Sequence, residues 1–283
     1  MPELVPSLNI TQVDSATNAL LEQAYAALIT NFQRATISQV FRNTNLSGNL
    51  TSGSVRAARY TNSVAQTYGT ARGAGAGSPL NEKPVLVQIK EYLEIVEEYE
   101  QFDDRTMPAY LREVIAGRNT DHANTIARVT EEDFFTTARD AGAQVAAVGA
   151  NPAEMFESLV LNLATLQNEF FHGVDRNMIY VTMNDAAYSA FRIHLNLDTR
   201  NANVNSAAEN FMVYNGVRVF PTPYMPADVG MMVQARGAVA NPSLILPYMV
   251  GQIPLSYANA LMTAFAKTAT AVMPDTIFWT PAS

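Results

Sequence analysis

With 283 residues, the chain is long enough to bury a sizeable core in one large domain or two smaller ones. Only 16% of its residues are charged and 48% are hydrophobic, which predicts a chain that is mostly interior or whose surface largely meets other protein. The formal net charge of -8 disfavours specific nucleic-acid binding, and the lack of cysteine excludes disulfides, thiolate zinc sites and cysteine nucleophiles.

The N-terminal segment carries neither the basic stretch nor the apolar run of a secretory signal, and no window approaches a membrane span. We therefore expect a protein that matures in a cytosol. A first helix is predicted from Asp14 or Ser15 onward, because apolar residues recur there at helical spacing: Leu21, Tyr25, Leu28 and Phe32.

Residues 43–81 are rich in Ser, Thr, Asn, Gly and Ala and show no core-forming pattern, which is uncommon inside a compact domain. Two predicted strands, 54–61 and 84–90, flank a glycine-rich tip at 70–78. We interpret this region as a long hairpin that projects from the body. Since an isolated two-stranded hairpin is marginal in water, it should lie on another surface.

A strand and then two long helices are predicted after the hairpin. Residues 91–104 fit either a strand or a helix, and we favour a strand to about Val96. Pro108 suits an early helical position, and the spacing after it predicts a long helix that ends at Gly142 and is kinked at Gly117. A second amphipathic helix is predicted from Ala153 to Phe171.

The stretch from Arg176 to Pro226 gives the clearest local signals. An apolar, β-branched run at 178–183 predicts a strand, and Asn184 with Asp185 is a good cap for a helix at 186–193. Residues 211–214 and 217–220 flank Asn215-Gly216, the dipeptide that best tolerates the positive φ angles of a two-residue hairpin turn. The prolines from position 221 onward end that ladder.

Short strands separated by glycine and proline fill the C-terminal part; they are predicted at 231–234, 243–246, 265–272 and 276–280. Long helices, mixed strands and no regular βαβ alternation indicate an α+β fold.

The order of a strand, "MNDAAYSAFR", a variable polar loop and "NGVRVFPTPYMP" resembles the middle of tailed-bacteriophage major capsid proteins. That family has the Hong Kong phage-type fold, which encapsulins and herpesvirus capsid floors share. The resemblance implies a Hong Kong phage-type major capsid fold in five parts: an N-terminal arm (1–48), an extended E-loop hairpin (49–84), a peripheral domain with a long spine helix (85–148), an axial domain (149–262) and a return to the peripheral domain (263–283).

The resemblance also implies a function in assembly. It implies a structural protein, not an enzyme: a tailed-bacteriophage major capsid protein that self-assembles through pentamers and hexamers into an icosahedral shell around double-stranded DNA. No cofactor, metal, membrane or sequence-specific DNA binding is implied. The expected location is the virion after assembly in the host cytoplasm, with separate scaffolding, portal and decoration proteins as further partners. An encapsulin-like compartment shell and a cytosolic enzyme remain the alternatives.

Charged residues on the hairpin and on the strand after it are the candidates for ion pairs between subunits: Arg56, Arg59, Arg72, Lys83, Glu94, Glu97, Glu98 and Glu100. Lys83 and Lys90 lie where some relatives form a covalent cross-link, but no partner is indicated and we expect none.

The sequence offers only weak signals for a nucleotide site, a metal site or an acid–base site. The tip lacks the third glycine and the following helix of a dinucleotide fingerprint, and His122, His172 and His194 lack metal-ligand spacing. The acidic cluster from Glu131 to Asp133 would serve the enzyme alternative, but a solvated helix face or an ion-pair partner is the simpler interpretation. We expect Trp279 to anchor the last strand and these methionines to fill core or a subunit contact: Met225, Met231, Met232 and Met249.

Overall fold

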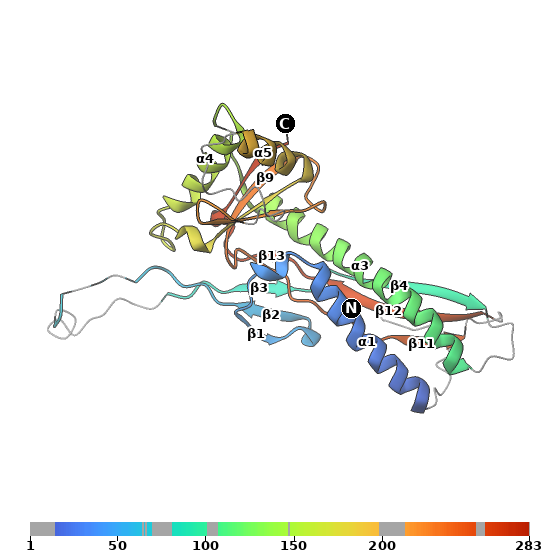
Figure 1. Ribbon diagram of the computed structural model, residues 1–283. Helices are drawn as coiled ribbons and strands as arrows, with labels where there is room; N and C mark the ends of the chain where they lie inside the picture. Colours follow the sequence, from blue (N-terminus) through green and yellow to red (C-terminus); the bar gives the residue numbers. More distant parts are fainter. Residues whose placement is uncertain are drawn as a thin grey trace. The chain divides into compact units, whose positions relative to one another are not determined.

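The computed structural model describes residues 15–63, 65, 67–69, 81–100, 107–146, 148–197, 213–252 and 258–282 (Figure 1). These residues form two compact units. The first unit contains the chain up to Thr36, Ile89–Thr130 and Ser243–Thr268, and the second contains Ile37–Gln88, Glu131–Pro242 and the chain from Ala269 onward. The glycine-rich tip, Arg72 and Asp14 lie outside the described residues.

The first unit packs two helices against a three-stranded sheet. The helices are α1 (Ser15–Ala35) and the first part of α3 (Met107–Ala141), and the antiparallel sheet has the order β11 (Met249–Gln252), β12 (Ala258–Lys267) and β4 (Glu91–Glu100). The strand predicted to about Val96 is thus confirmed and extends to Glu100. The predicted stripe of α1 enters the core together with residues of α3 and β12: Leu21, Leu28, Phe32, Ile115, Ile126, Leu261 and Phe265.

Helix α3 is continuous over 35 residues, with Pro108 in its first turn as predicted. Gly117 does not interrupt it. The helix ends before Gly142, whose amide donates to the carbonyl oxygen of Ala138 at 2.9 Å. Glycine is required there because a Cβ at position 142 would lie 2.7 Å from Ile277 Cγ2 and 2.8 Å from the Ala138 carbonyl oxygen.

Replacing Gly142 by alanine should therefore lower the free energy of unfolding by about 1–3 kcal/mol, the usual cost of overpacking. Urea denaturation followed by circular dichroism measures this loss. The matched control is Gly117→Ala, where a Cβ meets no atom within 4 Å. Because alanine is the better helix former, that change should raise stability by about 0.5–1 kcal/mol. A Gly142→Ala protein as stable as the parent would show that the close approach is not rigid.

The second unit is built on a six-stranded mixed sheet. The strand order is β5 (Ala143–Gln144), β14 (Ile277–Pro281), β9 (Val229–Ala235), β6 (Ile179–Met183), β8 (Val217–Pro221) and β7 (Val213–Tyr214). The pairs β5–β14 and β6–β8 are parallel, and the other three are antiparallel. The strands predicted around 178–183, 231–234 and 276–280 are confirmed.

Local capping and turn chemistry around this sheet follow the sequence signals. Asn184 Oδ1 accepts a hydrogen bond from the Ala187 amide at 2.7 Å at the start of α5 (Asp185–Leu197). Asn215 and Gly216 have φ angles of 48° and 81°, as a tight hairpin turn between β7 and β8 requires. The predicted residues 211–212 lie outside the described part of the chain.

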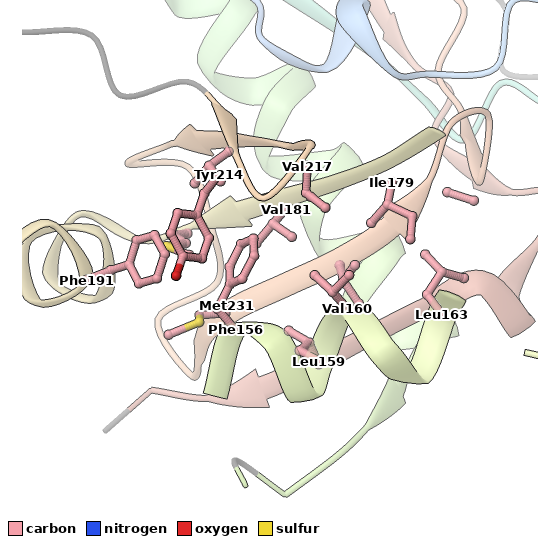
Figure 2. Close-up of a cluster of buried hydrophobic side chains, with 14 of the residues drawn as sticks. Phe156, Leu159, Val160, Leu163, Ile179, Val181, Phe191, Tyr214, Val217 and Met231 are labelled. Carbon is pink, nitrogen blue, oxygen red and sulfur yellow. The ribbon is translucent and has the colours of Figure 1, made fainter. Parts of the chain in front are cut away.

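Both faces of the central strand β6 are buried, because the sheet lies between two layers. Ile179, Val181 and Met183 face the cluster formed with α4 (Pro152–Ala164) and α5, which Figure 2 shows. Tyr180 faces a second cluster that contains the last turns of α3, with Phe134 and Phe135 among its members. This double burial explains why 178–183 lacks polar alternation.

Helix α4 is shorter than predicted, ending at Ala164 instead of Phe171. Thr165 caps it, and Asn168 then turns the chain because its Oδ1 accepts from the amides of Phe170 and Phe171, both at 2.8 Å. The helix was predicted about two turns too long because Leu166 and Phe170 continue the apolar helical spacing beyond Ala164.

Short elements complete the second unit. A small antiparallel sheet has the order β1 (Leu46–Asn49), β2 (Ser54–Ala57) and β3 (Val85–Gln88), and β10 (Val239–Ala240) pairs with β13 (Thr270–Ala271). Four 3₁₀ turns are present among the described residues of the whole chain: η1 (Ser38–Val40), η2 (Leu50–Ser52), η3 (Arg176–Met178) and η4 (Pro274–Thr276).

Two C-terminal predictions are corrected. The strand predicted at 265–272 is split between β12, which already begins at Ala258, and β13. The predicted strand at 243–246 is a single bridge between Ile245 and Phe265, while β11 was missed. These alanine-rich and methionine-rich strands gain their stability from pairing and burial, so their own residues carry only a weak strand signal.

Candidate functional site

The predicted hairpin continues outward from β2 and β3. Beyond the small sheet, Lys83 N donates to Arg59 O at 2.8 Å and Thr61 N donates to Asn81 O at 3.2 Å, with a bridge between Tyr60 and Glu82. The two segments therefore run antiparallel, as the sequence predicted.

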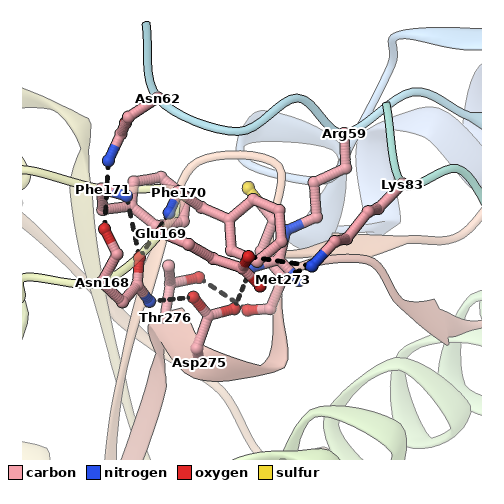
Figure 3. Close-up of polar contacts among 10 residues, drawn as sticks. All are labelled: Arg59, Asn62, Lys83, Asn168, Glu169, Phe170, Phe171, Met273, Asp275 and Thr276. Carbon is pink, nitrogen blue, oxygen red and sulfur yellow. Dashed lines mark hydrogen bonds and ion pairs between the residues drawn. The ribbon is translucent and has the colours of Figure 1, made fainter. Parts of the chain in front are cut away.

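Arg59, at the base of this hairpin, reaches back to the body of the second unit. Its guanidinium forms an ion pair with Asp275, and its Cζ lies 3.5 Å from the centroid of the Phe170 ring. The arginine side chain is only 13% exposed. The other carboxylate oxygen of Asp275 accepts from Asn168 Nδ2 (Figure 3). A guanidinium that is both stacked and paired in a partly buried site is strongly held.

The turn after α4 provides the remaining attachments of the hairpin. Asn62 donates from its amide to Glu169 O at 2.8 Å and from Nδ2 to Asn168 O at 3.1 Å (Figure 3). Lys83 Nζ pairs with the Glu169 carboxylate at 2.8 Å, but both side chains are more than half exposed. We call the half-buried part of this arrangement the hairpin clamp, defined as Arg59, Asn62, Asn168, Phe170 and Asp275.

Sequence reasoning missed most of the clamp. It named Arg59 and Lys83 as charged residues but gave no role to Asn62, Asn168 or Asp275. Arg59 and Asp275 are 216 positions apart, and no pattern in the chain links them. The only available local signal was the Asn168 side chain, because asparagine favours turns of this kind.

Arg56 lies on the exposed face of the small sheet. It pairs with Glu82 at 2.7 Å while remaining 50% exposed, and it is directly opposite Leu86, which is 53% exposed. Val55, Ala57 and Val87 are buried on the opposite face. We call the Arg56 and Leu86 side the outer face of the hairpin sheet.

Strand β4 of the first unit also has an outer face. Leu93 and Ile95 point to the core, so the alternate residues Tyr92, Glu94, Val96 and Glu98 lie on the other side and are exposed. Tyr92 and Val96 are 42% and 45% exposed. The β4 outer face thus alternates apolar and acidic side chains. Glu100 closes the strand opposite Ala258.

Glu97 is on the inner side of β4 and bonds within its own chain. It forms an ion pair with Arg118, and its Oε2 lies 2.9 Å from His122 Nε2. The hydrogen bonds from Arg118 are the main reason that the pKa of Glu97 is lowered, with a smaller contribution from His122. A shallow groove of about 380 Å³ lies beside it, lined by Glu97, Glu98, Val114 and Arg118.

The three histidines lie at separate places in the fold. His122 is buried, with Nδ1 2.9 Å from the Tyr248 hydroxyl, so it links α3 to the segment before β11. His172 lies in the bridged turn after α4, and His194 lies in the last turn of α5. Over the described residues, no three His, Cys, Asp or Glu side chains are grouped as metal ligands.

Glu131 corrects the sequence interpretation of the acidic cluster. It is fully buried, not solvated, and its carboxylate accepts from the Ser38 hydroxyl and from the Ser38 amide at 3.1 Å. Burial raises the pKa of Glu131, and the Ser38 bonds and the nearby Arg42 charge offset this only in part. A carboxylate enclosed in this way does not reach a substrate. Asp133 accepts from the Ala269 amide at 3.0 Å.

The remaining singled-out residues support the core. Trp279 donates from Nε1 to Arg139 O at 3.1 Å and so anchors β14 to α3, as expected. Met225, Met231 and Met232 are buried. Among the helices of the described residues, none combines the length and hydrophobicity needed to cross a lipid bilayer.

Sequence comparison finds no relative, since no protein-family model and no curated protein matches the chain. Comparison of the structure does find similar proteins. A capsid structure of the cyanophage P-SCSP1u aligns with a TM-score of 0.58 at 9% identity, covering 86% of this chain and 85% of that chain. The capsid of a native GTA particle aligns with a TM-score of 0.57 at 13% identity, covering 100% and 95%.

A third similar structure is a virus-like particle from Pyrococcus furiosus, with a TM-score of 0.55 at 11% identity and coverage of 92% and 98%. The three alignments cover most of each chain, so the likeness concerns the whole fold and not one shared motif. The chain therefore has the Hong Kong phage-type fold of tailed-phage capsid proteins, in agreement with the resemblance seen in its sequence.

Proposed function

We propose that the chain is a major capsid protein of a tailed phage, which assembles into an icosahedral shell that encloses double-stranded DNA. The observation that carries this proposal is the combination of the capsid fold with a hairpin that continues outward beyond the small sheet. The low charge content of the chain also suits a protein whose surface is largely covered by its copies. The five-part division and the separate scaffolding, portal and decoration proteins belong to the same proposal.

We further propose that the outer face of the hairpin sheet contacts the β4 outer face of another copy. Arg56 and Leu86 present a basic and an apolar side chain together, and Glu94 and Val96 present an acidic and an apolar one. Charges of opposite sign around exposed apolar residues are the pattern of a complementary interface. Arg56 also pairs with Glu82 of its own chain but stays 50% exposed. Among the other named candidates, Arg59, Lys83 and Glu97 bond within their own chain, and Arg72 lies outside the described residues.

Negative-stain electron microscopy of the purified protein tests the proposed function. We expect rings, hexamers or closed shells, and nucleic acid inside shells purified from an infected host. A monomer with no tendency to assemble at any concentration would contradict the capsid role. Shells that enclose a protein cargo instead of DNA would favour the compartment-shell alternative.

Charge reversal tests the proposed contact. The double variant Glu94→Arg and Glu98→Arg places like charges opposite Arg56, so the concentration needed for assembly should rise by about tenfold or more. Adding Arg56→Glu should restore part of the loss. Glu22→Arg, on the exposed side of α1, is the control and should assemble normally. Equal assembly of the double variant and this control would rule out the contact.

A further inference from the structure

We propose that the hairpin clamp is a positioning device that fixes the direction of the hairpin before assembly, with Arg59 as its central residue. The inference rests on the proposed function, because a fixed direction matters only if the hairpin is offered to another copy.

The clamp and the neighbouring Lys83–Glu169 ion pair together hold both strands of the hairpin at the point where they leave the small sheet. Arg59 and Asn62 attach the outgoing segment to the turn after α4 and to η4, and Lys83 attaches the returning segment to Glu169 (Figure 3). Attachments three residues apart on one strand, with another on its partner, oppose both a sideways swing and a rotation of the hairpin about its axis. A hairpin held only by β2 and β3 would lack this restraint.

The attachments differ in strength, and this difference singles out Arg59. The Lys83 and Glu169 side chains are 56% and 55% exposed, and such surface pairs contribute little. The Arg59 side chain is 13% exposed, stacks on Phe170 and pairs with Asp275, whose second oxygen is bonded to Asn168. Asn168 is in turn fixed by the amides of Phe170 and Phe171. Removing Arg59 therefore removes the stacked and ion-paired attachment and leaves the Asn62 hydrogen bonds to hold the outgoing segment, while removing Lys83 leaves both the Arg59 and the Asn62 attachments intact.

A fixed direction favours assembly for an entropic reason. A loosely attached hairpin must be ordered each time a copy joins the shell, and this ordering reduces the free energy available for association. A hairpin already held in its direction avoids most of that cost. The clamp thus acts on assembly through the geometry of the free subunit and contributes no contact to the neighbouring copy.

The test measures hairpin direction in the subunit and assembly in parallel. The chain has no cysteine, so Thr67→Cys on the hairpin and Asn162→Cys on α4 can carry two spin labels; both positions are exposed and belong to the second unit. With the clamp intact, the inter-label distance distribution of the unassembled protein should be narrow. Arg59→Ala should broaden it and raise the concentration needed for assembly roughly tenfold, whereas Lys83→Ala should change that concentration by less than about twofold.

Two further variants keep the test decisive. Arg59→Lys retains the charge but not the flat guanidinium on Phe170, so it should restore part of both effects. Asn62→Ala removes only the side-chain bond from Nδ2 to the Asn168 carbonyl oxygen, since the backbone amide still donates to Glu169 O. It serves if Arg59→Ala fails to fold, with Trp279 fluorescence as the folding check. A narrow distribution and normal assembly in Arg59→Ala or Asn62→Ala would overturn the inference while leaving the capsid role intact. Failure of the parent protein to assemble at all would instead count against the proposed function.

Discussion

Replacing Phe156 by alanine is expected to lower the free energy of unfolding of the second unit by about 3–5 kcal/mol, the usual cost of a large aromatic truncation in a core. Phe156 is fully buried on α4. Its ring stacks on Phe191 of α5 at a centroid distance of 5.2 Å and meets Tyr214 of β7 edge-on at 5.4 Å. Phe191 and Tyr214 also meet edge-on at 5.3 Å. Figure 2 shows that the three rings join two helices to the sheet, so one truncation removes contacts that α4 makes with both α5 and the sheet.

Urea denaturation followed by Trp279 fluorescence measures this loss, because the only tryptophan of the chain lies in β14 of the same unit. Leu161→Ala is the matched control on the same helix, since Leu161 is 45% exposed and alanine is a good helix former. It should change stability by no more than about 0.5 kcal/mol. If the free energies of unfolding of Phe156→Ala and of that control differed by less than about 1 kcal/mol, the aromatic cluster would not be closely packed.

Features set by neighbouring residues could be predicted from the sequence. The stripe of α1, the Asn184 cap and the Asn215-Gly216 turn each depend on contacts within a few positions, and the structure confirms all three. The fold class was predicted as well, because long helices and short strands in this order resemble one family of folds. The exact length of α4 was not predicted correctly, because the apolar pattern continues after Ala164 although the Asn168 turn redirects the chain.

Features set by distant residues could not be predicted. Arg59 was recognised as a charged hairpin residue, but its partner Asp275 is brought to it only by the folding of η4 beside the turn after α4. Glu131 belongs to an acidic run of the kind that predicts a solvated helix face. Glu131 is buried because the segment Ile37–Phe41 crosses that face of α3. No pattern in the residues near Glu131 predicts this crossing. Sequence periodicity identifies the exposed side of a helix only when no other segment covers it.

The buried Glu131 carboxylate should make the stability of the protein depend on pH in an unusual direction. Its pKa in the folded state is raised, chiefly by burial, above the ordinary value it has in the unfolded chain. The folded state therefore binds a proton more readily than the unfolded state, and the free energy of unfolding should increase as the pH falls from neutral toward the unfolded-state pKa. A paired surface carboxylate gives the opposite trend. Arg42, which donates to Asn241 O at 2.7 Å, faces the same site. Burial lowers the pKa of Arg42 and the Glu131 charge raises it, but an arginine stays protonated in this acidic range.

Three variants, compared by urea denaturation at a series of pH values, isolate this contribution. Glu131→Ala leaves the Ser38 amide and hydroxyl without their acceptor beside the Arg42 charge, so it should cost about 2–4 kcal/mol at pH 7. Glu131→Gln keeps an acceptor oxygen without a charge, so it should cost less and should not show the gain on acidification. Glu132→Ala, on the exposed side of the same turn, should match the parent in both respects. The stability of the parent protein and of Glu131→Gln could instead change with pH in parallel. That result would show that this carboxyl does not take up a proton in the folded state. Ser38 and Arg42 would then have to compensate the buried charge fully.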